Sequence, residues 1–279
     1  MAVYSCSVPD CGRFISQSIV PGGSPVALAQ PEVWSLFGFF CPACKAMRCD
    51  RCALRSVGTC ACGRSLQLAI APLPAEPGEG EAAPAADAAA DPARAHAYAA
   101  DIAARVCGDL VDYSTVDFGR ERRPGAHTLL LDRDGRRAGE RGIALVRLLR
   151  RMGLPPGVQA FANALRDLSG APEHAGRDQV VFVASPDPFD VVRVADVDPA
   201  NHDLTADDVV ERLARWHAQH GVEIVAADTD TVVFRFLQLP DDLAALTQEI
   251  VDFCPDIAET FEMEPDALTQ SPWVWLWWD

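Results

Sequence analysis

Apolar residues recur at helical and strand spacings between residues 93 and 186. A helix is predicted over 93–110, because its apolar residues share one face and Gly108 suits a C-terminal cap. A second helix is predicted over 141–152, and the two prolines that follow it forbid its continuation. Short apolar runs predict four strands, at 111–118, 128–131, 158–161 and 179–184.

The pattern after residue 187 predicts a unit of strands and helices in the order βαββαβ, the split-βαβ arrangement. Its first strand is expected at 191–195, and Thr205 and Asp208 can form a capping box for the helix that follows. The other strands are expected at 222–226, 231–237 and 273–277, with a second helix that begins at Pro240. We therefore predict an α+β fold class, in which two helices cover one face of a mostly antiparallel sheet.

Residues 1–70 hold eight of the ten cysteines, spaced as four pairs: Cys6 and Cys11, Cys41 and Cys44, Cys49 and Cys52, Cys60 and Cys62. A pair of thiolates a few residues apart can bind tetrahedral zinc from a tight turn, and two pairs complete one site. The eight cysteines therefore predict two structural Zn²⁺ ions. Each ion could take neighbouring pairs, or one ion could take the first and third pairs and the other the second and fourth.

The interleaved alternative is the cross-brace of RING and FYVE-type fingers, which are treble-clef-type modules, and the cysteine spacing resembles theirs in outline. It departs from RING fingers by having no histidine ligand, a wider first pair and a narrower last pair. The resemblance implies two zinc ions and does not extend to ubiquitin-ligase activity. With so few apolar residues, the module needs zinc binding for its folding, at about 10 kcal/mol per site.

Charge is distributed unevenly along the chain. Residues 193–279 carry 4 basic and 19 acidic side chains, a net charge of −15, whereas residues 1–72 carry 6 basic and 3 acidic ones. Eight thiolates with two Zn²⁺ ions would bring the first segment close to neutral. Nucleic acid and anionic membranes therefore fit poorly as ligands, and a protein partner of basic character fits the acidic part.

These observations predict four segments. They are a two-zinc module at 1–70, an Ala/Pro/Glu-rich linker at 71–92, an α+β subdomain at 93–186 and an acidic βαββαβ domain at 187–279. The N-terminus lacks the basic start and apolar run of a signal peptide, and no run of eighteen apolar residues occurs. We expect a cytoplasmic protein, where cysteines at these spacings bind metal rather than form disulfides. Lys45 is the only lysine among many arginines, which indicates a GC-rich bacterial gene.

The C-terminal part resembles an uncharacterised bacterial family, domain of unknown function 4253. The resemblance covers about 187–279 and rests on these stretches: Asp187–Ala195, Asp203–Asp208, Gly221–Ile224, Leu239–Leu243, Phe253–Asp256 and Leu276–Asp279. The stretch Ala258–Met263 departs from the family, which has a Gln-Gly pair there. The resemblance implies no activity, and the cysteine module lies outside it.

Several side chains could carry chemistry in the acidic domain. Cys254 could be a nucleophile with Asp256 nearby, although its position after the apolar stripe at a helix end favours a small buried side chain instead. His217 and His220 have the spacing of metal ligands and also that of cations in the last turn of a helix. A hydrolytic or Mg²⁺ site could form from four carboxylates, those of Asp228, Asp230, Asp256 and Asp279. No phosphate loop, zinc-protease motif or nucleophile elbow is present in the sequence.

The tryptophans near the C-terminus are expected to alternate about the final strand. We expect Trp273, Trp275 and Trp277 to pack beneath the two helices, with Trp278 on the other face, where it and Asp279 could contact a partner.

The sequence is typical of a zinc-binding, non-enzymatic protein, an adaptor or an immunity-type regulator that binds another protein. Candidates for the apolar surface of its zinc module are Trp34, Phe37, Phe39 and Phe40. Two alternatives stay open: a hydrolase that uses Cys254 and Asp256 or the acidic cluster, and nucleic-acid binding through the zinc module.

Overall fold

The computed structural model describes residues 2–18, 25–71, 90–114, 122–133, 135–163, 176–261, 268–269 and 272–278. Residues 72–89, most of the expected linker 71–92, lie outside the described residues. The described residues form two compact units. Unit 1 takes residues from 1–88, 100–108 and 147–156, and unit 2 takes residues from 89–99, 109–146 and 157–279.

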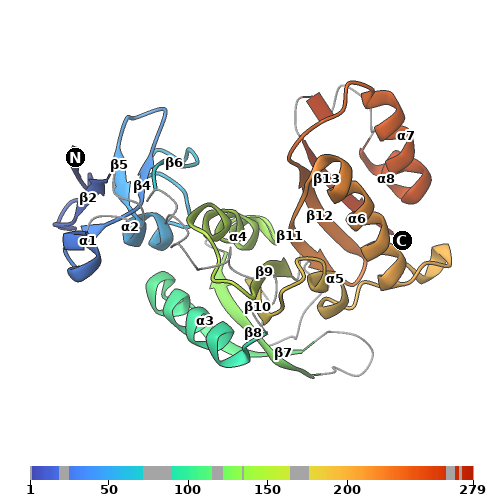
Figure 1. Ribbon diagram of the computed structural model, residues 1–279, viewed down its shortest axis with the longest axis horizontal. Coiled ribbons are helices and arrows are strands. Elements are labelled where there is room, and N and C mark those ends of the chain that lie inside the picture. The colour runs from blue at the N-terminus through green and yellow to red at the C-terminus, as the bar shows by residue number, and fades with distance from the viewer. Residues whose placement is uncertain are drawn as a thin grey trace, which may run out of the picture. The chain divides into compact units, whose positions relative to one another are not determined.

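Unit 1 is built on two small three-stranded sheets (Figure 1). The first has the order β1-β2-β3, with β1 (Ala2–Ser5), β2 (Phe14–Gln17) and β3 (Trp34–Ser35). The second has the order β5-β4-β6, with β4 (Gly38–Phe40), β5 (Met47–Cys49) and β6 (Gln67–Ile70). Two short helices accompany them, α1 (Pro25–Ala29) and α2 (Asp50–Arg55).

Gly38 lets the chain pass between two buried isoleucines in unit 1. A Cβ atom at this position would lie 2.9 Å from Cγ2 of Ile15 and 3.0 Å from Cβ of Ile70, distances that side chains do not tolerate. The small core of unit 1 therefore depends on close packing of few residues, as expected for a module with little apolar surface.

Unit 2 contains a seven-stranded sheet in the order β13-β12-β11-β9-β10-β8-β7. Its strands are β7 (Asp109–Ser114), β8 (Arg122–Asp132), β9 (Val158–Asn163), β10 (Arg177–Ala184), β11 (Val222–Asp228), β12 (Thr231–Phe236) and β13 (Trp273–Trp277). Only the β11–β9 pair is parallel among these strands, so the α+β class and the mostly antiparallel sheet are confirmed. The same sheet takes strands from both sides of residue 187.

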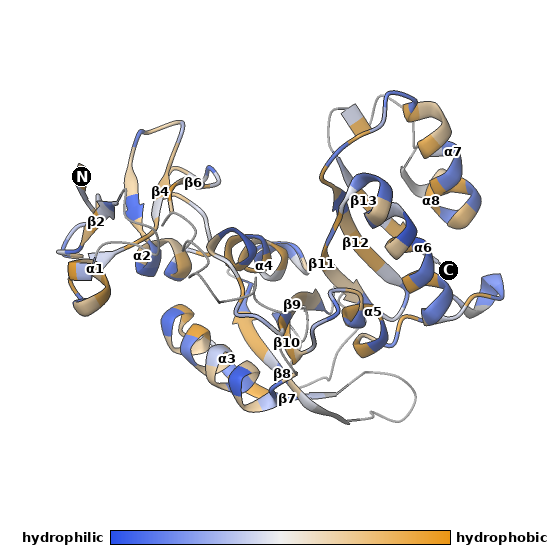
Figure 2. Cartoon of the chain, viewed as in Figure 1, coloured by the Kyte–Doolittle hydropathy of each residue, from blue (hydrophilic) through white to orange (hydrophobic). Residues whose placement is uncertain are grey.

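The longer helices carry both polar and apolar residues (Figure 2). Two of them, α3 (Pro92–Val106) and α4 (Glu140–Met152), contribute residues to both units. The others after α4 belong to unit 2: α5 (Asp190–Val194), α6 (Ala206–His220), α7 (Leu243–Phe253) and α8 (Asp256–Phe261). Within the described part of the chain, no helix has the length and apolarity needed to cross a bilayer.

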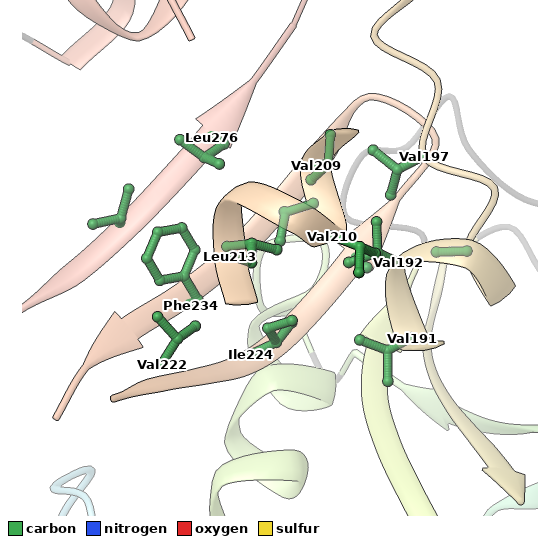
Figure 3. Close-up of a cluster of buried hydrophobic side chains, with 14 of the residues drawn as sticks. Val191, Val192, Val197, Val209, Val210, Leu213, Val222, Ile224, Phe234 and Leu276 are labelled. Atoms are coloured by element: carbon green, nitrogen blue, oxygen red, sulfur yellow. The ribbon is translucent and has the colours of Figure 1, made fainter. Parts of the chain in front are cut away.

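The core of unit 2 lies between α6 and the strands β11, β12 and β13 (Figure 3). Leu213 of α6 lies over the sheet beside Phe234 and Ile224, and Trp216 stacks on Phe234 with ring centroids 5.8 Å apart. The predicted capping box of α6 is confirmed, since Asp208 N–H donates to the Thr205 hydroxyl and Thr205 N–H to the Asp208 carboxylate. The apolar stripe of α6 therefore meets the sheet as its spacing predicts.

The strand predicted at 191–195 is wrong, because these residues form α5. Asp187 accepts a hydrogen bond from Phe189 N–H, and Ser185 Oγ donates to Asp190, so polar side chains start a helical turn despite the β-branched run. A βαββαβ order is present, but its first strand is β10. Two α-helices rather than one follow β10, and two follow β12. β9 lies between β10 and β11, which run in opposite directions, so the split-βαβ arrangement is not formed.

The alternation along β13 is the reverse of the predicted one. Val274, Leu276 and Trp278 are buried in the core, whereas the three tryptophans expected there are only partly buried. Trp278 packs edge-on against Phe253 of α7, with ring centroids 5.9 Å apart. Asp279 lies outside the described residues. The prediction placed Trp273, Trp275 and Trp277 in the core. The aliphatic residues that alternate with them, Val274 and Leu276, are the buried ones.

A buried carboxylate from a strand caps the N-terminus of α4. Asp178 of β10 is fully buried and accepts hydrogen bonds from three backbone N–H groups, those of Gly139, Arg141 and Gly142. Arg133 Nε donates to the same carboxylate at 2.9 Å. The charge of Asp178 therefore satisfies helix donors that would otherwise be buried without partners.

We predict that Asp178→Asn lowers the free energy of unfolding by about 3 kcal/mol, because it leaves Arg133 and the helix donors with a weaker acceptor. Chemical denaturation followed by fluorescence measures this change. Asp109→Asn is the matched control, because Asp109 also pairs with an arginine of β10, Arg177, but its side chain is 71% exposed. The control should change the free energy by less than about 0.5 kcal/mol, and an equal effect of both substitutions would contradict the account.

Candidate metal centres

The four cysteine pairs converge into two groups, each with all its sulfur atoms within 4.8 Å of one another. We call Cys6, Cys11, Cys49 and Cys52 tetrad 1, and Cys41, Cys44, Cys60 and Cys62 tetrad 2. The first pair therefore meets the third and the second meets the fourth, which is the interleaved alternative. In the described residues, no other group of three or more histidine, cysteine or acidic side chains is as close.

Three of the pairs lie in turns closed by a residue of positive φ directly after the second cysteine. The φ angles are 66° at Gly12, 62° at Lys45 and 81° at Gly63. In two of these turns this residue's N–H donates to the carbonyl of the first cysteine, Cys41 or Cys60, at 2.9 Å in both cases. The positive φ angle reverses the chain, so that both sulfur atoms of a pair lie on one side. Glycine adopts this backbone conformation at no steric cost. Lys45 adopts it as a non-glycine residue.

The third pair is positioned by a helix rather than a turn. Cys49 ends β5 and is the N-cap residue of α2, and Cys52 lies in the first turn of that helix. The N–H groups at the start of a helix favour negative charge, so this position suits thiolates. Three turns and one helix start thus supply the four pairs of two sites that no local segment could build alone.

Both tetrads hold thiols of raised and of lowered pKa. In tetrad 2, despite a backbone hydrogen bond from Ala46, the side chains of Cys60 and Cys41 raise the pKa of Cys44 to about 11. A hydrogen bond from the backbone N–H of Cys44 lowers the pKa of Cys41 to about 6. In tetrad 1, burial raises the pKa of Cys49 to about 11 and raises that of Cys52 as well. These buried thiols ionise at neutral pH only if a cation binds beside them.

The donor set fits a divalent metal of soft character. Four sulfur ligands complete a tetrahedral site and leave no position for water, as in structural zinc sites. Each tetrad could hold one such ion, and neither has the open coordination position of a catalytic site.

An ion pair that the sequence pattern did not reveal supports tetrad 1. Arg13, two residues after Cys11, forms a buried ion pair with Asp50, which directly follows Cys49. The same guanidinium donates to the carbonyls of Pro31 and Trp34, each at 2.6 Å. In the sequence, the only indication of this ion pair is that Arg13 and Asp50 have opposite charges and each lies close to a cysteine. Such a pattern is too common to predict a contact.

A cleft of about 490 Å³ lies beside this ion pair in unit 1. Its lining residues are Arg13, Ala27, Leu28, Pro31, Glu32, Trp34, Leu36, Phe37, Asp50, Arg51, Asp101 and Arg105. Two of the aromatic residues expected at the surface, Trp34 and Phe37, therefore line a cleft. Phe39 is fully buried, which corrects that expectation, and Lys45 Nζ lies over the Phe40 ring at 5.6 Å.

Cys254, the candidate nucleophile, lies in the core. It is fully buried, its Sγ donates to the carbonyl of Trp277 at 3.0 Å, and burial raises its pKa to about 11. Asp256 is paired with His202, whose Nε2 lies 2.8 Å from the carboxylate. A thiol in this environment is held protonated at neutral pH, which opposes nucleophilic attack.

The other candidate residues have local structural roles. His217 Nδ1 accepts a hydrogen bond from Val222 N–H at 2.9 Å, at the turn that ends α6. Asp228 accepts from Thr229 N–H at 3.0 Å, and Asp230 accepts from the Thr231 hydroxyl at 2.7 Å. The structure therefore does not bring these carboxylates together into a metal-binding group within the described residues.

We predict that Cys254 resists alkylation by iodoacetamide in the folded, metal-bound chain at pH 8, because the thiol is buried and its pKa is about 11. Cys107, which is exposed, is the internal control and should react readily. Peptide mass spectrometry after alkylation measures both. Modification of Cys254 as fast as Cys107 would show a reactive thiol and would revive the nucleophile hypothesis.

Comparison with known proteins identifies one part of the chain. Neither the search of curated proteins nor the search of solved structures found a match. The model of one protein family matches residues 179–279, which include β11, β12, β13 and the helices that cover them. This C-terminal part thus matches the family described as domain of unknown function DUF4253.

Proposed function

We propose that this chain is a zinc-binding, non-enzymatic adaptor or regulatory protein of the cytoplasm. The observation that carries the proposal is the convergence of eight cysteines into two closed tetrads. Metal sites with four cysteine ligands are usually structural rather than catalytic, because no coordination position is left for substrate or water. The ion would be Zn²⁺ in both, because separate mononuclear sites on tight turns suit zinc.

The cleft of unit 1 is the surface that we assign to partner binding. Leu28, Trp34 and Phe37 supply an apolar wall, and arginine and carboxylate side chains surround it. An apolar anchor enclosed by polar groups is the usual composition of a protein interface. Metal bound at tetrad 1 would hold this wall rigid, because Arg13 ties Trp34 to the segment that carries Cys49 and Cys52.

The acidic C-terminal part suggests the charge of the partner. The excess of carboxylates over 193–279 would attract a basic protein and speed its association. An immunity-type protein that masks a basic toxin is one concrete form of this function. The environment of Cys254 supports a binding role over a hydrolytic one.

Purified without chelator, the chain should contain two zinc ions, and a strong chelator should unfold unit 1. Each site contributes about 10 kcal/mol to folding, so residues 2–18 and 25–71 should lose amide protection while β10, β11 and α6 keep theirs. Hydrogen–deuterium exchange with and without chelator measures this. Amides of 25–71 that stay protected after complete metal removal would contradict a structural role of the metal.

The partner should contact the cleft through Leu28. Leu28→Asp should weaken partner binding at least about tenfold, because it removes an apolar anchor and desolvates a carboxylate in the interface, which costs more than ~1.4 kcal/mol. Val26→Asp is the matched control, because the two side chains lie on α1 and are 55% (Val26) and 54% (Leu28) exposed, but only Leu28 lines the cleft. Quantitative affinity purification from the native host, followed by titration with the identified protein, measures both variants. Equal binding by Leu28→Asp and wild type would place the interface elsewhere.

A further inference from the structure

The two tetrads differ in their exposure to solvent. In tetrad 1, Cys49 and Cys52 are buried and Cys6 and Cys11 are partly buried. These sulfur atoms pack in an apolar cluster with Ile15, Ile70, Val8 and Met47. In tetrad 2, Cys44 and Cys62 are exposed. Solvent therefore reaches the ligands of one site and is largely kept from those of the other.

The two tetrads also differ in which elements of unit 1 they link. Tetrad 1 ties the segment between β1 and β2 to β5 and the start of α2, beside the Arg13–Asp50 ion pair and the cleft. Tetrad 2 ties the turn between β4 and β5 to the segment 60–62, which precedes β6. Loss of a metal from tetrad 2 would release a turn and a loop, whereas loss from tetrad 1 would disrupt the centre of unit 1.

We infer that tetrad 2 is a redox-labile zinc site that releases its ion on oxidation by peroxide, while tetrad 1 keeps its ion. This inference rests on the proposed binding of zinc by both tetrads. Thiolate reactivity depends on access as well as on ionisation, and only tetrad 2 presents thiolates at the surface.

The sulfur atoms of tetrad 2 are already placed for disulfide formation. Cys44 Sγ lies 3.4 Å from Cys60 Sγ, and Cys62 Sγ lies 3.5 Å from Cys41 Sγ. Each exposed cysteine thus has a buried partner within a short movement of the S–S bond length of about 2.05 Å. The guanidinium of Arg48 donates to Cys60 Sγ at 3.9 Å.

The reaction balances without any further reagent. An exposed thiolate attacks hydrogen peroxide, the O–O bond breaks, and sulfenic acid and one hydroxide form. The partner thiolate then attacks the sulfenic sulfur, so that an S–S bond forms and a second hydroxide leaves. Two thiolates and one peroxide thus give one disulfide and two hydroxides, which take up protons from water. Disulfide sulfur is a poor ligand, so Zn²⁺ is released.

The test uses the full chain, with its zinc content measured before oxidation. Under limiting hydrogen peroxide, a zinc-binding dye should report one of the two ions in a fast phase. Peptide mapping without reduction should then find disulfides within tetrad 2 and free thiols in tetrad 1. Release of both ions in one phase, or a first disulfide within tetrad 1, would overturn the inference. A chain purified without zinc would instead overturn the proposed function, and this is visible before peroxide is added.

A matched pair of variants separates reactivity from simple weakening of a site. Cys62→Ser removes an exposed ligand of tetrad 2 and should abolish the fast phase, leaving one ion that is released slowly. Cys6→Ser removes a ligand of tetrad 1 and should leave the fast phase of tetrad 2 in place. If Cys6→Ser does not fold, the peptide map of the wild-type chain alone decides which tetrad is oxidised first. A fast phase that survives in Cys62→Ser would also overturn the inference.

Discussion

Unit 1 depends on bringing eight sulfur atoms from four separate segments into two tetrads. Three turns with a residue of positive φ and one helix start present the pairs, and the interleaved pairing links segments that are up to 46 residues apart, as Cys6 and Cys52 are. The buried thiols of Cys49 and Cys52 need a cation beside them to ionise at neutral pH. Metal coordination would thus supply the long-range order that so small an apolar core cannot.

Unit 2 is organised on a different principle. Its sheet and helices enclose a core of aliphatic and aromatic side chains, and the buried carboxylate of Asp178 is hydrogen-bonded at the start of α4. Among the described strands, its one parallel pair is β9 and β11, and the strands β10 and β11, which the family model matches, both pair with β9, which precedes the match. Burial of apolar area stabilises this unit.

Local features were predictable from the sequence, and features set by tertiary packing were not. The cysteine spacing predicted the pairs of thiols that form the tetrads, and the Thr205–Asp208 capping box predicted the start of α6, because both depend on neighbours a few residues away. The pairing of the cysteines stayed open because spacing alone fits either arrangement. Val191 and Val192 favour a strand by propensity, yet local polar contacts start α5. The Arg13–Asp50 pair and the cleft arise from distant segments and leave no periodic signal.

The interleaved, all-sulfur pairing is tested most directly by replacing the metal with ¹¹³Cd and recording proton–cadmium correlation spectra. Two cadmium resonances at the chemical shifts of four-sulfur sites are predicted. One should correlate with the β-protons of Cys6, Cys11, Cys49 and Cys52, and the other with those of Cys41, Cys44, Cys60 and Cys62. A resonance correlated with Cys6, Cys11, Cys41 and Cys44 would contradict the account, as would a single resonance for the whole chain.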